Sequence, residues 1–196
     1  MPSVLQTRPS TRSGRLTWFA ATALVAVGAT TTSLPSETTN MSPLTVTLKV
    51  TGAAAVPGVD VVVGDPAPQL SVVIKNTSSA SVRLWKDSCS FGYRTLSLDI
   101  TDKAGKHFVV TRVERIWEKD FPAWDTLAPG ATMSTELSVT SKDWQGLPSL
   151  KAGERRAVRM HAVYHSAPEY QAQLNSVWVG SVASDDIDVT LLNPQK

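Results

Sequence analysis

Cysteine is almost absent from this chain, which has only Cys89 among its 196 residues. A lone cysteine cannot form a disulfide within the chain, so an antibody-type domain stapled by a spaced cysteine pair is excluded. A reactive thiol or a disulfide to another chain would be functional alternatives. We interpret Cys89 instead as a small apolar residue under a loop, because no histidine lies beside it in the sequence to activate the thiol.

Catalytic sequence motifs are also lacking. The chain contains no G-x-S-x-G, H-E-x-x-H or S-x-x-K motif and no glycine-rich phosphate-binding loop. We therefore predict a protein that is not an enzyme, with no catalytic residues and no cofactor. A hydrolase whose site no motif reveals is retained only as a third hypothesis.

A surplus of positive charge is missing once the N-terminus is set aside. The chain has 19 Lys and Arg against 17 Asp and Glu, but Arg8, Arg12 and Arg15 all lie in the first 29 residues. Without these three the balance is 16 against 17. Binding to nucleic acid or to anionic lipid depends on clustered positive charge, so neither partner is predicted.

The N-terminus has the pattern of an export signal. The three arginines precede an uncharged apolar run, Leu16–Ala29, which is shorter than the roughly 20 residues that span a bilayer. We predict a signal peptide at residues 1–29, a flexible Thr/Ser-rich spacer at 30–43, one domain at 44–196, and a periplasmic or secreted protein. If the segment were not cleaved, it would be the only contact with a membrane.

Helical periodicity is the next absence, because no stretch of eleven residues shows a convincing repeat of apolar side chains at i, i+3 and i+4. Apolar and polar residues alternate instead, which is typical of strands with one buried face. The alternating or strand-like segments are 44–50, 58–65, 70–75, 82–84, 95–100, 133–139, 157–165 and 187–191. Turn residues separate several of them, at 76–81, 102–106 and 127–132.

These segments predict an all-β domain of about seven to nine antiparallel strands, packed as two sheets face to face. The turn residues come in the order N-x-S, D-x-x-G and L-x-P-G: Asn76, Ser78, Asp102, Gly105, Leu127, Pro129 and Gly130. Over residues 69–165 the chain resembles the immunoglobulin-like and fibronectin-III-like β-sandwiches of exported bacterial proteins. This order is also similar to the BsuPI-type proteinase-inhibitor domain, and that resemblance would imply a protease as partner.

Metal binding is not predicted from the histidines or from the acidic residues near the C-terminus. His161 and His165 could share an ion on a helix, but four residues along a strand separate them by about 13 Å. Asp185, Asp186 and Asp188 lack the spacing of a calcium loop. We expect all of them to be solvated polar residues.

Aromatic residues gather in the least strand-like region, 113–130. Trp117, Phe121 and Trp124 lie there, and Trp144 follows in a second loop. Such side chains either plug the open end of a β-sandwich or form a binding surface. We predict that these four residues bind a protein partner, a protease among the candidates. The alternative is a carbohydrate-binding β-sandwich whose exposed tryptophans stack on sugar rings.

Overall fold

The computed structural model describes residues 42–51 and 59–194. The predicted signal peptide and residues 30–41 of the predicted spacer lie outside this part of the chain. Among the described residues, no helix is both long and apolar enough to cross a membrane. The described residues belong to one compact unit, Asn40–Lys196.

The described chain is all-β, with 47% strand and 6% helix, as the alternation of side chains predicts. The strands are β1 (Leu44–Val50), β2 (Val61–Val62), β3 (Leu70–Asn76), β4 (Val82–Trp85), β5 (Leu96–Asp102), β6 (His107–Arg112), β7 (Trp124–Leu127), β8 (Thr132–Leu137), β9 (Trp144–Gln145), β10 (Arg155–Ser166), β11 (Gly180–Ala183) and β12 (Ile187–Leu192). Two short helices, α1 (Ser90–Tyr93) and α2 (Tyr170–Leu174), were not expected from the sequence. Both are little more than one turn long, so neither leaves a readable apolar period.

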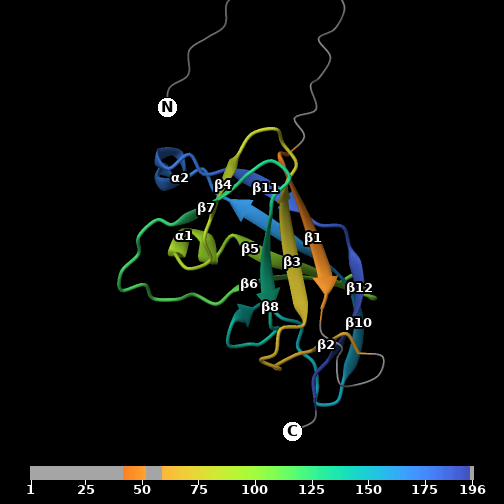
Figure 1. The fold of residues 1–196 in the computed structure, drawn as a ribbon. Coiled ribbons are helices and arrows are strands. Elements are labelled where there is room, and N and C mark those ends of the chain that lie inside the picture. Colours follow the sequence, from red (N-terminus) through yellow and green to blue (C-terminus); the bar gives the residue numbers. More distant parts are fainter. Residues whose placement is uncertain (1–41, 52–58, 195–196) are drawn as a thin grey trace, which may run out of the picture. The chain divides into compact units, whose positions relative to one another are not determined.

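Three sheets arise from these strands (Figure 1). One has the order β1-β3-β8, and the largest has the order β2-β12-β10-β5-β6-β9 with β11 also paired to β10. A third, β4-β7, has two strands. Every pairing within the sheets is antiparallel except that of β2 with β12. The prediction of antiparallel sheets is therefore confirmed for every pairing of the described strands but this one.

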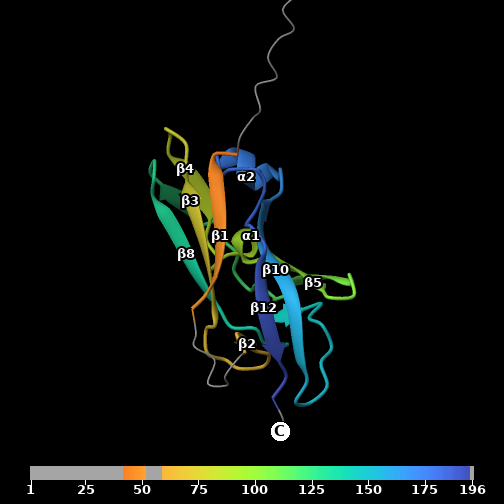
Figure 2. The same cartoon turned by 90° about the vertical axis from the view of Figure 1, so that its right-hand side faces the viewer.

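The first two sheets face each other as two layers, which Figure 2 shows edge-on. In β1, Leu44, Val46 and Leu48 point inward and are buried, whereas Thr45 and Thr47 are exposed. β5 and β10 present Leu98, Ile100, Met160 and Ala162 from the opposite layer to the same core. Burial of each large aliphatic side chain contributes about 1.5–3 kcal/mol, so this interface holds the two layers together.

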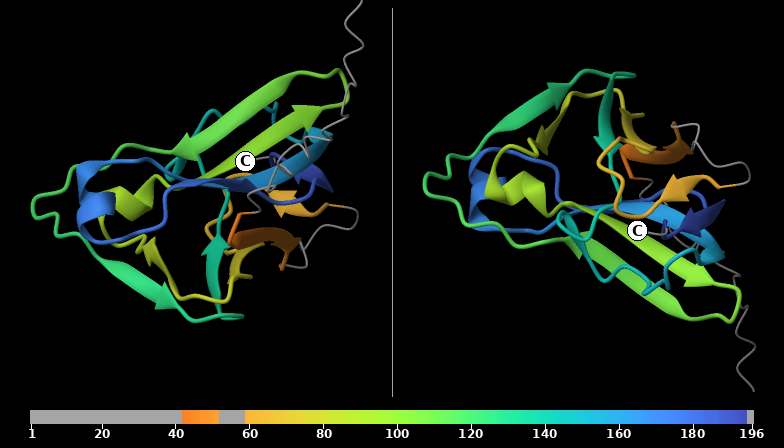
Figure 3. Two further views of the ribbon diagram at one scale, coloured as in Figure 1. Left: turned by 90° about the horizontal axis from the view of Figure 1, so that it is seen from above. Right: turned by 90° about the horizontal axis from the view of Figure 1, so that it is seen from below.

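A second, smaller apolar cluster lies apart from the main core. Its buried members are Trp85, Cys89, Ala172 and Val177, with Phe91, Ala123 and Trp124 packed against them. It joins β4, β7, α1 and α2, which lie near one another in Figure 3. The Cys89 thiol points to the carbonyl oxygens of Lys86 and Ala123, at 3.2 and 3.5 Å. Cys89 is thus a buried apolar residue under a loop, in agreement with our interpretation.

The turn residues that carry the family resemblance have structural roles here. The buried Asn76 donates from its side-chain amide to the carbonyl oxygens of Ala80 and Leu127, and its own side-chain oxygen accepts from Ser78. The backbone of Gly130 donates to the Asn76 carbonyl at 2.9 Å. Asn76 therefore fixes the end of β3 to the turn between β7 and β8. These contacts support a sandwich-like fold and do not themselves form a binding site.

Candidate functional site

The segment between β6 and β7, residues 113–123, forms one long loop that we name the contact loop. Trp117 lies edge-on against Tyr93 of α1, with ring centroids 5.8 Å apart. The Arg115 guanidinium lies 5.2 Å from the Tyr93 ring centroid and 5.6 Å from that of Trp117. Trp117 is half-buried by these contacts, so it supports the loop from beneath.

A polar contact holds the second half of the contact loop to the same helix. The Asp120 carboxylate accepts a hydrogen bond from the Ser90 backbone amide at 2.9 Å and another from the Ser90 hydroxyl. Ser90 is the first residue of α1. The loop is therefore fastened to α1 at two places, by the Trp117 ring and by the Asp120 carboxylate.

On either side of these two fastenings the loop exposes a large apolar side chain. Ile116 is 94% exposed and Phe121 is 76% exposed. Neither side chain has a polar atom that could bond to water, so their exposure is unfavourable. The two residues are only five positions apart in the sequence. A supported loop that holds bare apolar side chains in solvent has the anatomy of a contact surface.

The structure separates the four predicted binding residues into three environments. Trp117 and Phe121 belong to the contact loop. Trp124 begins β7 and is half-buried, with its ring 6.4 Å from that of Trp85 in an edge-on arrangement and the Arg83 guanidinium 5.4 Å from its centroid. Trp144 is only 1% exposed and belongs to the main core.

Trp144 has the role of a plug, the alternative that the sequence left open. Its indole Nε1–H donates to the Ser138 carbonyl at 2.9 Å, and the Arg112 guanidinium lies 4.3 Å from its ring centroid. A ring in this position holds Arg112 in place and offers no surface to a partner.

A cavity of about 290 Å³ opens where the two layers diverge. One wall is apolar, from Val72, Ile74, Leu96 and Met133. The other lining groups are mostly polar or aromatic and come from β4 and the segment after it, β6, β7, β8 and β10: Trp85, Lys86, Asp87, Ser88, Gly92, Thr95, Arg112, Asp125, Ser134, Thr135 and Tyr164. The sequence did not indicate this cavity, because its walls belong to strands far apart in the chain.

Two lining groups have polar atoms that are buried without a hydrogen-bond partner among the described residues: the Tyr164 hydroxyl and Arg112 Nε. Tyr164 is 1% exposed, and its ring stacks on Trp178 with centroids 5.9 Å apart. Burial raises the pKa of Tyr164 to about 12, an increase tempered by Thr95 and the Trp85 backbone beside the hydroxyl. Neither of these neighbours completes a hydrogen bond to it.

The raised pKa of Tyr164 predicts a loss of stability at high pH. The unfolded chain has a tyrosine pKa near 10.0, so between pH 10 and 12 the unfolded state releases a proton that the folded state retains. The contribution of Tyr164 to the free energy of unfolding is therefore fully present below pH 10. It falls by about 2–3 kcal/mol as pH rises toward 12. We expect urea unfolding of Tyr164→Phe to lack this part of the decline. Equal declines in the variant and the parent protein would contradict the assignment.

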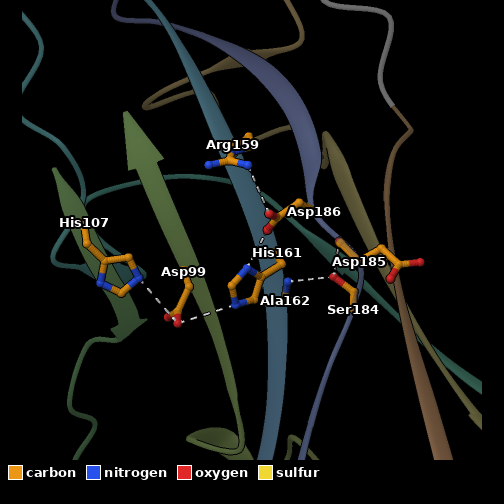
Figure 4. Close-up of polar contacts among 8 residues, drawn as sticks. All are labelled: Asp99, His107, Arg159, His161, Ala162, Ser184, Asp185 and Asp186. Carbon is orange, nitrogen blue, oxygen red and sulfur yellow. Dashed lines mark hydrogen bonds and ion pairs between the residues drawn. The ribbon is translucent and has the colours of Figure 1, made fainter. Parts of the chain in front are cut away.

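A row of polar side chains crosses the outer face of the large sheet (Figure 4). The His161 Nδ1 lies 2.8 Å from Asp186 Oδ1, and its Nε2 lies 3.6 Å from Asp99 Oδ2. His107 Nε2 approaches the same Asp99 oxygen at 3.7 Å, and Arg159 pairs with Asp186 at 3.9 Å. Asp99 thus lies between two histidines (Figure 4).

This row follows from strand register. Asp99 in β5 is directly opposite His161 in β10, and His107 in β6 is diagonal to Asp99, opposite Thr101. In the described part of the chain, no group of three or more His, Cys, Asp or Glu side chains is arranged to hold a metal ion. His165 is exposed and lies four residues further along β10, opposite Ser181 of β11 and apart from the row. Asp99 links the two histidines as a cross-strand contact on a solvated face.

The sequence missed both the cavity and the histidine row for the same reason. Each joins residues from different strands, and alternation within one strand does not give the register between strands.

Comparison with known proteins adds no assignment: no protein-family model, curated protein or solved structure matches the chain.

Proposed function

We propose that this protein is an exported, non-enzymatic binding module that contacts a protein partner through the contact loop. The observation that carries the proposal is the pair Ile116 and Phe121, both largely exposed on a loop that Trp117 and Asp120 fasten to α1. Because the loop is already held in place, less conformational entropy is lost when a partner binds it.

The partner we propose has an apolar cleft that receives Phe121 and Ile116. Between these two side chains, Glu118, Lys119 and Asp120 alternate in charge, so the tip of the loop combines apolar anchors with a polar rim. A protease cleft has this character. The BsuPI-type resemblance supports a protease as the first partner to test, and the apolar signal-like segment supports an exported location.

The arrangement of the tryptophans favours a protein partner over a carbohydrate. Sugar binding by stacking would use exposed, coplanar rings, whereas Trp144 is in the core. Trp117 is engaged by Tyr93 and Arg115, and Trp124 by Trp85 and Arg83. None of the three predicted tryptophans therefore has a ring that is free of contacts with neighbouring side chains.

We expect the double variant Ile116→Ser/Phe121→Ser to lose binding while it retains the fold. Removal of two central apolar anchors weakens an interface by about 2 kcal/mol or more for each anchor. Immobilised parent and variant protein would be incubated with purified extracellular proteases and with periplasmic or culture extracts. Complexes would then be quantified by mass spectrometry and confirmed with the isolated partner by size-exclusion chromatography.

A second exposed apolar pair provides the matched control. Tyr170 and Leu174 on α2 are 72% and 62% exposed, so Tyr170→Ser/Leu174→Ser removes comparable apolar surface elsewhere. The parent protein and the control variant should both retain the partner. In either double variant, the free energy of unfolding measured in urea should change by no more than about 0.5 kcal/mol. Equal recovery of every protein by the contact-loop variant and the parent would reject the proposed function.

A further inference from the structure

The cavity between the two layers lies at the base of the contact loop without including the loop itself. Arg112 ends β6 immediately before the loop, and Asp125 lies in β7 immediately after it. Both residues line the cavity. The lining of the cavity is therefore separate from the contact loop, and a ligand of the cavity would not depend on a partner of the loop.

Arg112 supplies an oriented positive charge to this cavity. Its guanidinium is fixed over the Trp144 ring at 4.3 Å, and Tyr93 lies on another side at 5.5 Å. Its ion pair with Asp87 is 3.7 Å long, which exceeds hydrogen-bond distance. Together with the unpartnered Nε, this leaves Arg112 with donor capacity that the described protein groups do not use.

Tyr164 supplies a second donor from a fully buried position. Its hydroxyl has no partner, and the two groups beside it, Thr95 and the Trp85 backbone, also belong to residues that line the cavity. A buried hydroxyl without a hydrogen-bond partner destabilises the folded protein, because it loses its bonds to water. A ligand oxygen that accepts from Tyr164 or Arg112 would offset that loss.

The remaining lining determines what else the ligand must contain. Val72, Ile74, Leu96 and Met133 provide an apolar wall, while Lys86 is already paired with Asp125 at 3.1 Å. The volume lies just below the roughly 300–1,000 Å³ of ligand pockets. Only a small molecule fits, with one acceptor group and one short apolar arm.

We propose that the cavity binds a small aliphatic or aromatic carboxylic acid, with its carboxylate on Arg112 and Tyr164 and its apolar arm against Val72, Ile74 and Met133. A carboxylate is favoured over a neutral acceptor because a planar guanidinium matches its geometry and charge. Asp87 is the group that opposes the ligand, since it shares Arg112 and also lines the cavity.

The test uses 4-methylpentanoate and its uncharged amide as probes, titrated into the full chain by calorimetry and by two-dimensional NMR. We expect the acid to bind with a dissociation constant on the order of 0.1–1 mM. The amide should bind at least tenfold more weakly, because it loses the charge-assisted hydrogen bonds. Shifted NMR signals should include those of Ile74 and Met133 and exclude those of the α2 residues.

Three variants of cavity residues and one control variant outside the cavity test the proposal. Tyr164→Phe removes only the unpartnered hydroxyl and should weaken acid binding about fivefold, whereas Tyr170→Phe removes an exposed hydroxyl outside the cavity and should change nothing. Asp87→Asn should tighten binding about threefold, because it removes the carboxylate that shares Arg112. Arg112→Gln should abolish detectable binding of the acid.

Several results would overturn the proposal. These are no saturable binding of the acid, equal binding of acid and amide, or unchanged acid binding in Tyr164→Phe together with Asp87→Asn. Absence of saturation would mean that water alone satisfies the two buried donors. If Arg112→Gln fails to fold because Arg112 packs on Trp144, the other two variants still decide the question. Failure here leaves the contact-loop proposal unaffected, because its variants lie outside the cavity.

Discussion

Replacement of Trp144 by alanine should lower the free energy of unfolding by roughly 3–5 kcal/mol. The indole is 1% exposed, belongs to the main core and donates its N–H to the Ser138 carbonyl at 2.9 Å. Truncation would leave a cavity beneath β9 and would also remove the ring on which Arg112 rests. Urea unfolding followed by circular dichroism measures the change.

The Trp144→Phe variant is the matched control, because it retains an aromatic ring and loses mainly the hydrogen bond to Ser138. We expect it to cost about 1–2 kcal/mol. A Trp144→Ala protein as stable as the parent would contradict the placement of this ring in the core. The sequence left open whether Trp144 plugs the core or binds a partner, and this comparison measures the first role directly.

Gly146→Ala should be of similar severity for a different reason. Gly146 has φ of +84°, and a Cβ atom added to it would lie 2.2 Å from the carbonyl oxygen of Val109 in β6. The left-handed conformation costs a non-glycine residue about 1–2 kcal/mol, and displacement of a backbone strand adds to that. We expect a total loss of roughly 3–5 kcal/mol, measured by thermal or urea unfolding.

Gly105→Ala separates the two contributions. Gly105 has φ of +80°, close to that of Gly146, but its Cβ position meets nothing within 4 Å. Its substitution should therefore cost only the conformational part, about 1–2 kcal/mol. If both variants lost the same stability, the close approach of Gly146 to β6 would not be present in solution.

The strands were the most predictable part of this molecule. In β1 and β5 the buried residues are the ones that alternation selects, because one face of each strand packs against the opposite sheet. Alternation fails for β6, where only Val110 is buried and Val109 is 53% exposed. This strand lies toward one side of its sheet, so little of it faces the other layer.

Pairing of strands was less predictable than their existence. Residues 69–100 were expected to form three strands, and they form β3, β4 and β5, but these lie in three different sheets. β4 pairs with β7, which is distant in sequence, and α1 comes between β4 and β5. Nothing in a local pattern distinguishes a turn that returns to its neighbour from one that changes layers.

The candidate site was predictable only in its location on the chain. Composition drew attention to residues 113–130, but it could not tell that Trp117 supports the loop while Ile116 and Phe121 face solvent. Ile116 was missed because a single aliphatic residue among charges carries no distinctive signal. The cavity donors Arg112 and Tyr164 were missed because their significance comes from what surrounds them and not from their spacing.

The smaller apolar cluster around Trp85 has a further consequence for how this protein could diversify. The contact loop is attached to α1, and α1 packs into that cluster and not into the main core. Mutations that reshape the loop or α1 therefore weaken mainly the packing of this smaller cluster. The packing of β1, β3, β5 and β10 in the main core is left unchanged. The sequence of the loop between β6 and β7 can therefore vary without first requiring a more stable framework.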